Sequence, residues 1–321
     1  MRAGAAPTLP SVYAGRRAFS EDIIGQMRDG FDHAGLDAGV MVVINGSFAR
    51  REASALSDVD FQIITRDRVD PDQARAIADA VWSAPGPHAG LRERGKEGAF
   101  GAVECVDDFL RNIGGQGDDN NKLTRRSLFL LEGEVLFNRA LFEDLRSRLL
   151  QRYVPETVQP HELTLFLLND FIRYWRTICV DYEFKTEEAG KQWAIRNVKL
   201  AFSRKLLYFG GLLAVAETAR RIRSEKLSAL TDLLALSPVE RVLVVFGDAA
   251  LPVLEPYEHF LTALSEADTR AHLDGLSKDK RDADAVYQRL RNDGKLFTWG
   301  LMNLFNRHYP PQHPIHESIL F

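Results

Sequence analysis

The sequence predicts an α+β fold, in which an α/β head with a mixed sheet is followed by a helical C-terminal domain. β-Branched apolar runs fall within residues 39–106, whereas from about residue 123 onward the apolar residues recur with the 3.6-residue period of helices. A polar, glycine-rich stretch at 114–121 (GGQGDDNN) separates the two patterns and is typical of a surface loop or hinge. We therefore expect an α/β domain at 1–122 and a helical domain at 123–321.

The head is expected to alternate helices with buried strands. Residues 20–34 have a helical pattern, and the run GVMVVIN at 39–45 is typical of a buried strand. A second strand, VDFQIIT at 59–65, precedes a helix at 71–82 and a third strand, GAFGAVECV, at 98–106. Strands that alternate with helices in this way indicate an α/β arrangement.

The rest of the chain is expected to be helical. Its longest apolar run, 206–216, is shorter than the roughly 18 residues that a membrane span needs. It also contains Gly210 and Gly211, so we interpret it as part of a core helix. The expected helical segments are 123–132, 139–152, 161–182, 190–216, 238–246, 251–272 and 280–306.

Composition and charge exclude several classes of protein. The 321 residues are 45% hydrophobic and 27% charged, as in a globular protein, and the formal net charge of −4 gives no general basic field. Any site for a polyanion must therefore be local.

Cys105 and Cys179 have no metal-ligand spacing and are expected to be buried free thiols. Because the first ten residues lack the apolar core of a signal peptide, we expect a cytoplasmic protein with no membrane segment.

The most informative stretch is NGSFARREASALSDVDFQIIT, at 45–65. Asp58 and Asp60 open the second expected strand, where side chains two positions apart point to the same face. Two adjacent carboxylates repel each other unless a cation neutralises them, and oxygen ligands at this spacing suit Mg²⁺ or Mn²⁺. Gly46 allows a phosphate to approach the backbone closely, and Ser47 offers a hydroxyl donor. Together these residues predict a site for a metal-bound nucleoside triphosphate (NTP).

Gly-Ser followed about ten residues later by Asp-x-Asp resembles the signature of the DNA polymerase β-like nucleotidyltransferase superfamily. The form here, GSFAR-x-E and then SDVDF, is similar to a branch of bacterial putative nucleotidyltransferases. The resemblance implies that two divalent ions activate an acceptor hydroxyl and brace the triphosphate, so that a nucleoside monophosphate is transferred and pyrophosphate is released.

The resemblance also implies roles for individual residues. Gly46 and Ser47 would hold the β- and γ-phosphates, and Asp58 and Asp60 would be metal ligands. Arg50 would lie near the phosphates, with Glu52 orienting it.

A third carboxylate in this superfamily comes from a later strand. Glu104 lies inside the third expected strand, where an unpaired acid is costly unless it reaches a cation. We therefore expect Glu104 to be the third metal ligand and a catalytic residue with Asp58 and Asp60, although the residue in the superfamily is usually aspartate. Asp107 and Asp108 are the alternatives, but they also suit the first turn of a following helix.

Two further polar patterns leave alternatives open. In the expected helix at 161–182, a stripe of Asp170, Arg173, Thr177 and Asp181 either pairs within the helix or faces a cleft. The segment 118–126 either caps a helix or forms a hinge that brings Arg125 or Arg126 to the cleft.

The expected helix at 190–216 places Gln192, Arg196, Lys199 and Ser203 on one line. In the superfamily a helical domain often contributes Lys and Ser to the triphosphate, so Lys199 and Ser203, with Arg196 behind them, resemble nucleotide-binding residues. Nine lysines and arginines but only two glutamates fall within 191–226. This basic segment is otherwise a solvated face that includes Arg220, Arg221, Arg223 and Lys226, or a surface that binds RNA phosphates.

The expected function is therefore Mg²⁺- or Mn²⁺-dependent transfer of a nucleoside monophosphate from an NTP to a hydroxyl acceptor. The acceptor stays open among a small molecule such as an aminoglycoside, a protein side chain, a tRNA end and another nucleotide. The base preference and the oligomeric state also stay open. A nucleotide-binding regulator without activity, and an RNA-binding module that uses residues 191–226, are the alternatives.

Overall fold

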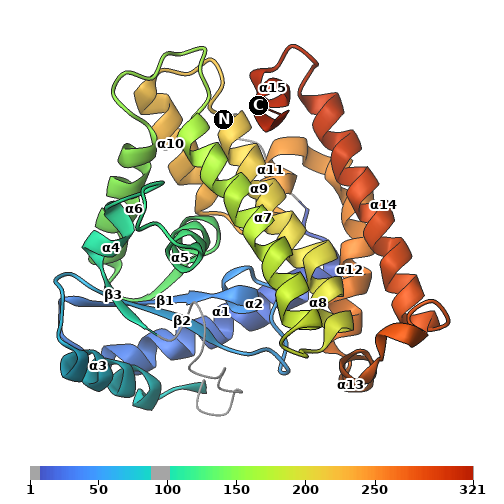
Figure 1. The fold of residues 1–321 in the computed structure, drawn as a ribbon, viewed down its shortest axis with the longest axis horizontal. Helices are drawn as coiled ribbons and strands as arrows, with labels where there is room; N and C mark the ends of the chain where they lie inside the picture. Colours follow the sequence, from blue (N-terminus) through green and yellow to red (C-terminus); the bar gives the residue numbers. More distant parts are fainter. Residues whose placement is uncertain (1–7, 88–101, 321) are drawn as a thin grey trace.

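The computed structural model describes residues 8–87 and 102–320 and confirms an α+β fold (Figure 1). Its described strands form one mixed four-stranded sheet in the order β3-β2-β1-β4. β1 (Val40–Asn45) pairs in antiparallel fashion with β2 (Asp60–Thr65) and with β4 (Glu134–Phe137), and β3 (Val103–Cys105) runs parallel to β2.

One face of the sheet packs against α1 (Ser11–Asp32) and α3 (Pro71–Ser83), which lie together beneath it in Figure 1. Alternate strand residues supply this core, as expected for buried strands whose side chains point in turn to opposite faces. The short helix α2 (Gly46–Ala49) follows β1 directly. The buried strand and α1 side chains of this core are Val40, Val42, Ile44, Phe61, Ile63, Ile24, Met27 and Phe31.

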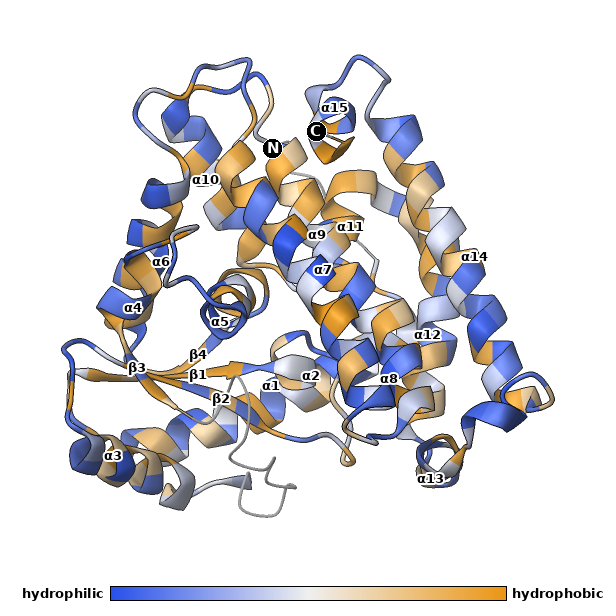
Figure 2. Cartoon of the chain, viewed as in Figure 1, coloured by the Kyte–Doolittle hydropathy of each residue, from blue (hydrophilic) through white to orange (hydrophobic). Residues whose placement is uncertain are grey.

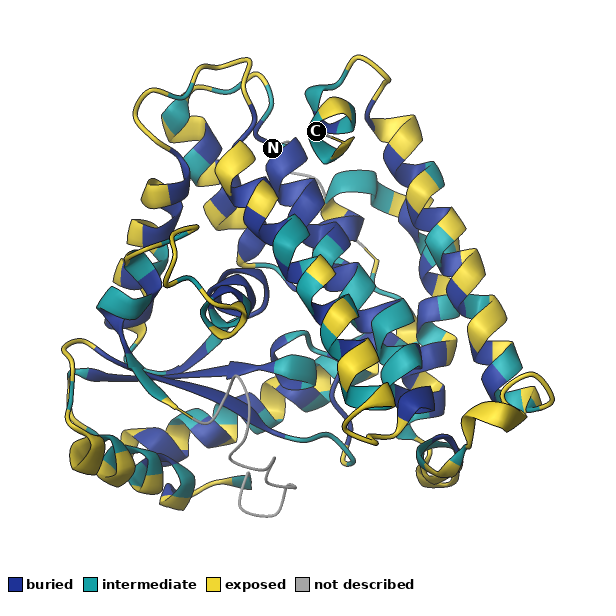
Figure 3. Cartoon of the chain, in the orientation of Figure 1, coloured by how far each residue is buried: buried dark blue, intermediate teal, exposed yellow. Residues whose placement is uncertain are grey.

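The opposite face of the sheet belongs to the large core of the helical half. Met41, Val43 and Ile64 join this core beneath α5 (Asn120–Leu131), which is flanked by α4 (Val106–Leu110) and α6 (Arg139–Tyr153). The second half of α5, from Arg126 to Leu131, is buried, whereas its first two residues are exposed (Figure 3). The same hydrophobic core therefore links the sheet to the helices.

The core of the helical half contains the apolar helix α9 (Lys205–Ala216), which is the most uniformly hydrophobic helix in Figure 2. This helix is continuous with α8 (Trp193–Lys199) through a π-helical segment, Leu200–Arg204. Short 3₁₀ turns lie at Gly247–Ala250 and Lys278–Lys280. The other helices are α7 (Leu165–Glu187), α10 (Arg223–Leu234), α11 (Pro238–Phe246), α12 (Leu251–Ser265), α13 (Ala267–Gly275), α14 (Ala285–His308) and α15 (Pro314–Leu320).

Most expected elements are present, with four informative differences. β4 was not predicted, because a four-residue strand between two helices carries little period-2 signal. α10 was not predicted either, and the expected helix at 251–272 breaks at Glu266 into α12 and α13. The strand expected at 98–106 covers only 103–105 in the described residues, because Val106 already begins α4; residues 98–101 lie outside the described part of the chain.

The two cysteines differ in their exposure to solvent. Both cysteines are free, but only Cys105 is buried, whereas Cys179 is partly exposed because it lies on an outer part of α7. Over residues 8–87 and 102–320, no helix combines the length and the apolar character needed to cross a membrane.

A buried ion network fixes the 114–121 loop to the helices. Arg126 on α5 donates to Asp118 at 2.8 Å and to Asp170 on α7 at 2.8 Å, and its Nε donates to the Tyr153 hydroxyl at 2.6 Å. The side chains of Arg126, Asp118 and Asp170 are at most 3% exposed. Arg173 also pairs with Asp170 at 2.7 Å, so Asp170 and Arg173 pair within α7, the first of the two alternatives.

Removing the arginine of this network leaves two buried carboxylates without their main partner. We expect Arg126→Met to lower the free energy of unfolding by about 3–5 kcal/mol, measured by urea denaturation. Arg148→Met is the matched control, because Arg148 makes a single exposed pair with Asp144 and should cost less than about 1 kcal/mol. Similar losses in the two variants would contradict a central role for the Arg126 network.

Candidate functional site

A cleft of about 540 Å³ lies between the sheet and the helical half. Its lining includes Gly46 and Ser47 of α2 and Lys199 at the end of α8, two helices whose labels lie close together in Figure 1. Seven of the nine sequence-predicted site residues line it, from both halves of the chain: Gly46, Ser47, Arg50, Asp58, Asp60, Lys199 and Ser203. The described lining does not include Glu104 or Arg196.

Gly46 is required by its surroundings at the end of β1. Its φ of +73° is a conformation that side-chain-bearing residues rarely adopt. A Cβ atom at this position would also lie 2.7 Å from the Asp60 Oδ2 atom. The antiparallel register explains this proximity, because Asn45 pairs with Asp60 across β1 and β2. The glycine therefore lets the Gly-Ser turn lie directly against the aspartate pair.

Asp60 projects from the sheet face that carries Ile64, which is the face toward the helical half. Asp60 is only 7% exposed, and it lines the cleft together with Asp58, which lies two residues before the start of β2. The sequence-based expectation that the two carboxylates share one site thus agrees with their positions.

The structure does not bring Glu104 to this pair. Parallel pairing places Glu104 beside Ile64, four residues beyond Asp60, which is about 13 Å farther along the strand. Its carboxylate instead accepts a hydrogen bond from Arg125. Burial raises the pKa of Glu104, and Arg125 counteracts this by favouring the ionised form. The expected role of Glu104 as a ligand beside the two aspartates therefore lacks the geometry that it needs.

The alternatives for a third carboxylate have structural roles at α4. Asp108 accepts a hydrogen bond from the Cys105 amide at 3.2 Å, and Asp107 pairs with Arg111 one turn later. Both therefore stabilise the first turn of a helix, as their alternative interpretation predicts. Within the described ranges, no group of three or more His, Cys, Asp or Glu side chains is arranged to hold a metal ion.

Arg50 lies between two buried carboxylates rather than facing only the open cleft. Its Nε donates to Glu52 at 2.9 Å and its Nη1 to Glu132 at 2.6 Å. Burial alone would lower the pKa of Arg50, but Glu52 and Glu132 outweigh it and hold this pKa well above its usual value. Glu52 therefore contacts Arg50, as the expected orienting role requires, and the two carboxylates balance the charge of the arginine.

Glu132 is a site residue that the sequence analysis missed. Its second oxygen accepts a hydrogen bond from the Gly46 amide at 2.8 Å, so one side chain holds both Gly46 and Arg50. Burial raises the pKa of Glu132, although Arg50 and the Gly46 amide favour its ionised form. Glu132 lies 80 residues beyond Glu52 and belongs to no recognisable pattern, so only the pairing of β4 with β1 brings it to the site.

A tyrosine connects this network to the helical half. The Tyr257 hydroxyl, on α12, donates to Glu52 and lies 3.4 Å from the Ser203 hydroxyl. Burial and the neighbouring Glu52 raise the pKa of Tyr257 well above its usual value, so the hydroxyl keeps its proton and remains a donor. A continuous series of hydrogen bonds thus runs from the Gly46 turn through Arg50 to Ser203.

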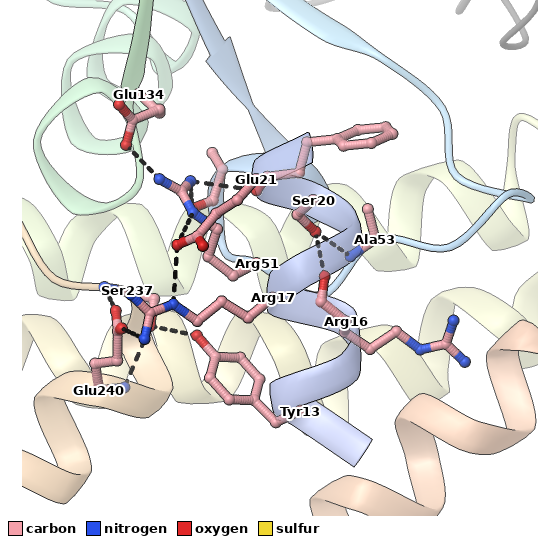
Figure 4. Close-up of polar contacts among 12 residues, drawn as sticks. Tyr13, Arg16, Arg17, Ser20, Glu21, Arg51, Ala53, Glu134, Ser237 and Glu240 are labelled. Carbon is pink, nitrogen blue, oxygen red and sulfur yellow. Dashed lines mark hydrogen bonds and ion pairs between the residues drawn. The ribbon is translucent and has the colours of Figure 1, made fainter. Parts of the chain in front are cut away.

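Arg51, the next residue, is anchored on the other side of the turn (Figure 4). It adopts a φ of +64° and pairs with Glu134 at 2.7 Å and with Glu21 of α1 at 3.7 Å. Nearby, the Ser20 hydroxyl accepts a hydrogen bond from the Ala53 amide at 3.2 Å. Helix α1 therefore fixes the chain that leads from the Gly-Ser turn to the aspartate pair.

The same close-up shows how α1 is itself held against the helical half. The Tyr13 and Ser237 hydroxyls lie 2.6 Å apart, and Arg17 pairs with Glu21 at 2.9 Å and with Glu240 of α11 at 3.1 Å (Figure 4).

The helical wall of the cleft includes consecutive residues of the π-helical segment. Lys199, Ser203 and Arg204 line the cleft, whereas Arg196 is not among the described lining residues. The expectation of one straight line of polar residues assumed a regular α-helix, and the π-helical hydrogen bonding after Lys199 changes that geometry. Asp181 of α7 also lines the cleft, where it pairs with Lys185 at 2.8 Å.

The basic segment 191–226 does not behave as one solvated surface. Lys226 is fully buried and its ammonium donates to the backbone carbonyls of Pro160, Glu162 and Thr218, so the expectation that it is solvated was wrong. These three hydrogen bonds compensate for the burial of the ammonium group. Arg223 similarly donates to the Val154 carbonyl at 3.1 Å.

Residues 118–126 cap α5 and join a buried ion network. Asp119 caps α5 by accepting a hydrogen bond from the Lys122 amide at 2.9 Å, as the capping interpretation predicts. Arg125 pairs with Glu104 and Arg126 lies in the buried network, and neither is among the described residues that line the cleft.

Comparison with protein families finds no family model that matches this chain, and a search of curated proteins finds no match.

Two substitutions of Glu132 separate its hydrogen bonds from its charge. Glu132→Leu removes a partner from both Gly46 and Arg50, so we expect a loss of about 2–4 kcal/mol in the free energy of unfolding. Glu132→Gln keeps an oxygen for the Gly46 amide and leaves Glu52 to neutralise Arg50, so the loss should be under about 1.5 kcal/mol. Urea denaturation at pH 7 measures both free energies of unfolding. Equal losses in the two variants would show that the hydrogen bond to Gly46 contributes nothing beyond the charge of Glu132.

The raised pKa of Glu132 predicts a pH dependence of stability. Folded protein retains the Glu132 proton above pH 4.5, where the unfolded chain has begun to lose it. The resulting stabilisation is fully present below pH 4.5 and disappears as the pH rises through the raised pKa. Unfolding free energies measured over this range should therefore fall more in the wild type than in Glu132→Gln; an identical pH profile in both proteins would exclude this effect.

Proposed function

We propose that the protein is a divalent-cation-dependent nucleotidyltransferase that moves a nucleoside monophosphate from an NTP to a hydroxyl acceptor and releases pyrophosphate. One observation carries the proposal. The Gly46-Ser47 turn and the Asp58/Asp60 pair line the same cleft as Lys199 and Ser203, although the two sets are some 140 residues apart. Side chains suited to bind phosphate and side chains suited to bind a cation thus line one cavity.

The arrangement of the head supports the proposed nucleotidyltransferase fold. The Gly-Ser turn follows the end of β1, and the aspartate pair lies at the start of the adjacent antiparallel strand β2. The segment between the two strands therefore brings the turn and the aspartates to the same end of the sheet. The resemblance to the DNA polymerase β-like superfamily depends on this proximity, which is supplied here by the pairing of Asn45 with Asp60.

The donor set at the aspartate pair suits Mg²⁺ or Mn²⁺. Asp58 and Asp60 provide hard carboxylate oxygens on one side of the cleft, and such cations take one or two protein carboxylates together with water and phosphate oxygens. When bound, the cation neutralises phosphate charge and favours the ionised form of an acceptor hydroxyl.

Other residues of the cleft would bind and orient the substrates. Lys199 and Arg204 place positive charge opposite the aspartates, where they attract a triphosphate, and Ser47 and Ser203 offer hydroxyl donors to its oxygens. An apolar wall beside these groups limits access of water and suits the flat face of a base or the body of an acceptor. This wall includes Ile178, Leu207, Phe260, Leu261 and Leu264.

A nucleotide-binding regulator without transferase activity is a second candidate. It is favoured by one observation, namely that Glu104, Asp107 and Asp108 all have other partners and none is brought beside Asp58 and Asp60. Release of pyrophosphate from an NTP, dependent on a divalent cation, distinguishes the enzyme from the regulator.

Transfer can be tested without knowing the acceptor. Purified protein is incubated with each α-labelled NTP and Mg²⁺ or Mn²⁺, with and without cell extract, and the small-molecule, RNA and protein fractions are separated. We expect label in one fraction, reduced at least 100-fold in Asp58→Ala/Asp60→Ala because both cation ligands are lost. Glu143→Ala, which removes only a surface pair with Arg139, is the control. Binding of NTP without transfer to any fraction would support the regulator.

Two cations of one helical run provide a matched test of nucleotide binding. Lys199→Ala should weaken binding of a labelled NTP about tenfold, because a charge-assisted contact to phosphate is lost. Arg196→Ala should change affinity less than twofold, since Arg196 is not part of the described lining. Isothermal titration calorimetry measures both, and equal effects would place the triphosphate elsewhere.

A further inference from the structure

Asn45 is a fully buried polar residue whose side-chain carboxamide makes no hydrogen bond to any residue that the structure describes. It is the last residue of β1 and is 0% exposed, and both atoms of its carboxamide are buried without a partner. Buried polar groups are almost always paired, because desolvation without a hydrogen bond is unfavourable. An unpaired carboxamide beside a candidate site therefore points to a ligand that pairs with it.

The register of the sheet places Asn45 directly beside the aspartate pair. Asn45 is opposite Asp60 in the antiparallel pairing of β1 and β2, and opposite residues extend from the same face with Cβ atoms about 4.5–5.5 Å apart. Met41 and Val43, at alternate positions before it, belong to the core on the helical side. The Asn45 side chain thus lies on the same sheet face as Asp60. Neither Asn45 nor Gln62 is among the described residues that line the cleft, so both amides lie in the layer behind Asp60, and a cation would reach them only from the Asp60 side.

A second carboxamide repeats the pattern on the neighbouring strand. Gln62 lies two residues after Asp60 on the same face and is only 4% exposed. Its Nε2 donates to the Arg125 carbonyl at 3.1 Å, whereas its Oε1 is buried without a partner. Asp60 is therefore flanked, across the sheet and along the strand, by two amide oxygens that make no hydrogen bond to a described residue.

We propose that the Asn45 carboxamide oxygen belongs to the cation site and supplies the third protein oxygen beside Asp58 and Asp60, with Gln62 adjacent. This inference rests on the proposed metal-dependent function. Amide oxygens are ordinary ligands of hard cations. With an amide oxygen as the third ligand, the site would need no third carboxylate. The two aspartates balance the charge of one divalent ion, and the negative charge of the triphosphate balances that of a second.

Binding of Mn²⁺, measured from the electron paramagnetic resonance signal of the free ion, tests the proposal independently of activity. The full chain is titrated with Mn²⁺, alone and with α,β-methylene-ATP, whose α–β linkage resists transfer. Asn45→Leu, which keeps the size but removes both polar atoms, should weaken Mn²⁺ binding at least tenfold. Thr164→Val is the matched control, because Thr164 is also buried with an unpartnered hydroxyl but lies at the start of α7.

Asn45→Asp provides a second variant whose expected effect has the opposite sign. A carboxylate at this position adds a charged oxygen to the same site, so Mn²⁺ should bind more tightly than to the wild type and should raise the melting temperature by a larger amount. This variant keeps the test decisive if Asn45→Leu does not fold.

Each outcome separates this inference from the proposed function. Mn²⁺ binding that is lost in Asp58→Ala/Asp60→Ala but unchanged in both Asn45 variants overturns the role of Asn45 alone. Equal weakening in Asn45→Leu and Thr164→Val also overturns it. A wild-type protein that binds no Mn²⁺, with or without the nucleotide analogue, overturns the metal-dependent function and this inference together.

Discussion

The candidate site depends on one buried arginine held between two carboxylates. Arg50 joins Glu52, which follows it in the same turn, to Glu132, which enters from the end of α5. The two acids are 2% exposed, so neither is stable there without the guanidinium, and the guanidinium is not stable there without them. Through Gly46 on one side and Tyr257 on the other, this cluster fixes the distance between the sheet and the helices.

The two halves of the chain are consequently parts of one packed body. Met41, Val43 and Ile64 of the sheet share a core with α5 and α9, and β4 enters the sheet from beyond the glycine-rich loop. The sequence pattern changes from strand-rich to helix-rich near residue 122. The hydrophobic cores do not change there, because the larger core contains residues from both sides of that boundary. The loop at 114–121 accordingly contributes a buried ion pair through Asp118 rather than acting only as a connection.

The sequence was most informative where chemistry and local geometry coincide. Gly46 and Asp60 could be identified because the glycine conformation and the strand alternation are both local properties. Glu104 could not be placed, because its position depends on the register between β2 and β3, which no local pattern encodes. Glu132 and Lys226 were missed or misinterpreted for the same reason, since each depends on partners more than 60 residues away.

The π-helical segment Leu200–Arg204 has a consequence for how this wall of the cleft tolerates change in length. A π-turn accommodates one residue more than an α-turn, and one residue corresponds to about 100° of rotation around the helix. The segment therefore sets the phase between α8 and α9, so that the apolar surface of α9 stays in the core while Ser203 and Arg204 face the cavity. Deleting a single residue here would regularise the helix, yet it would turn one of these two surfaces away from its partner.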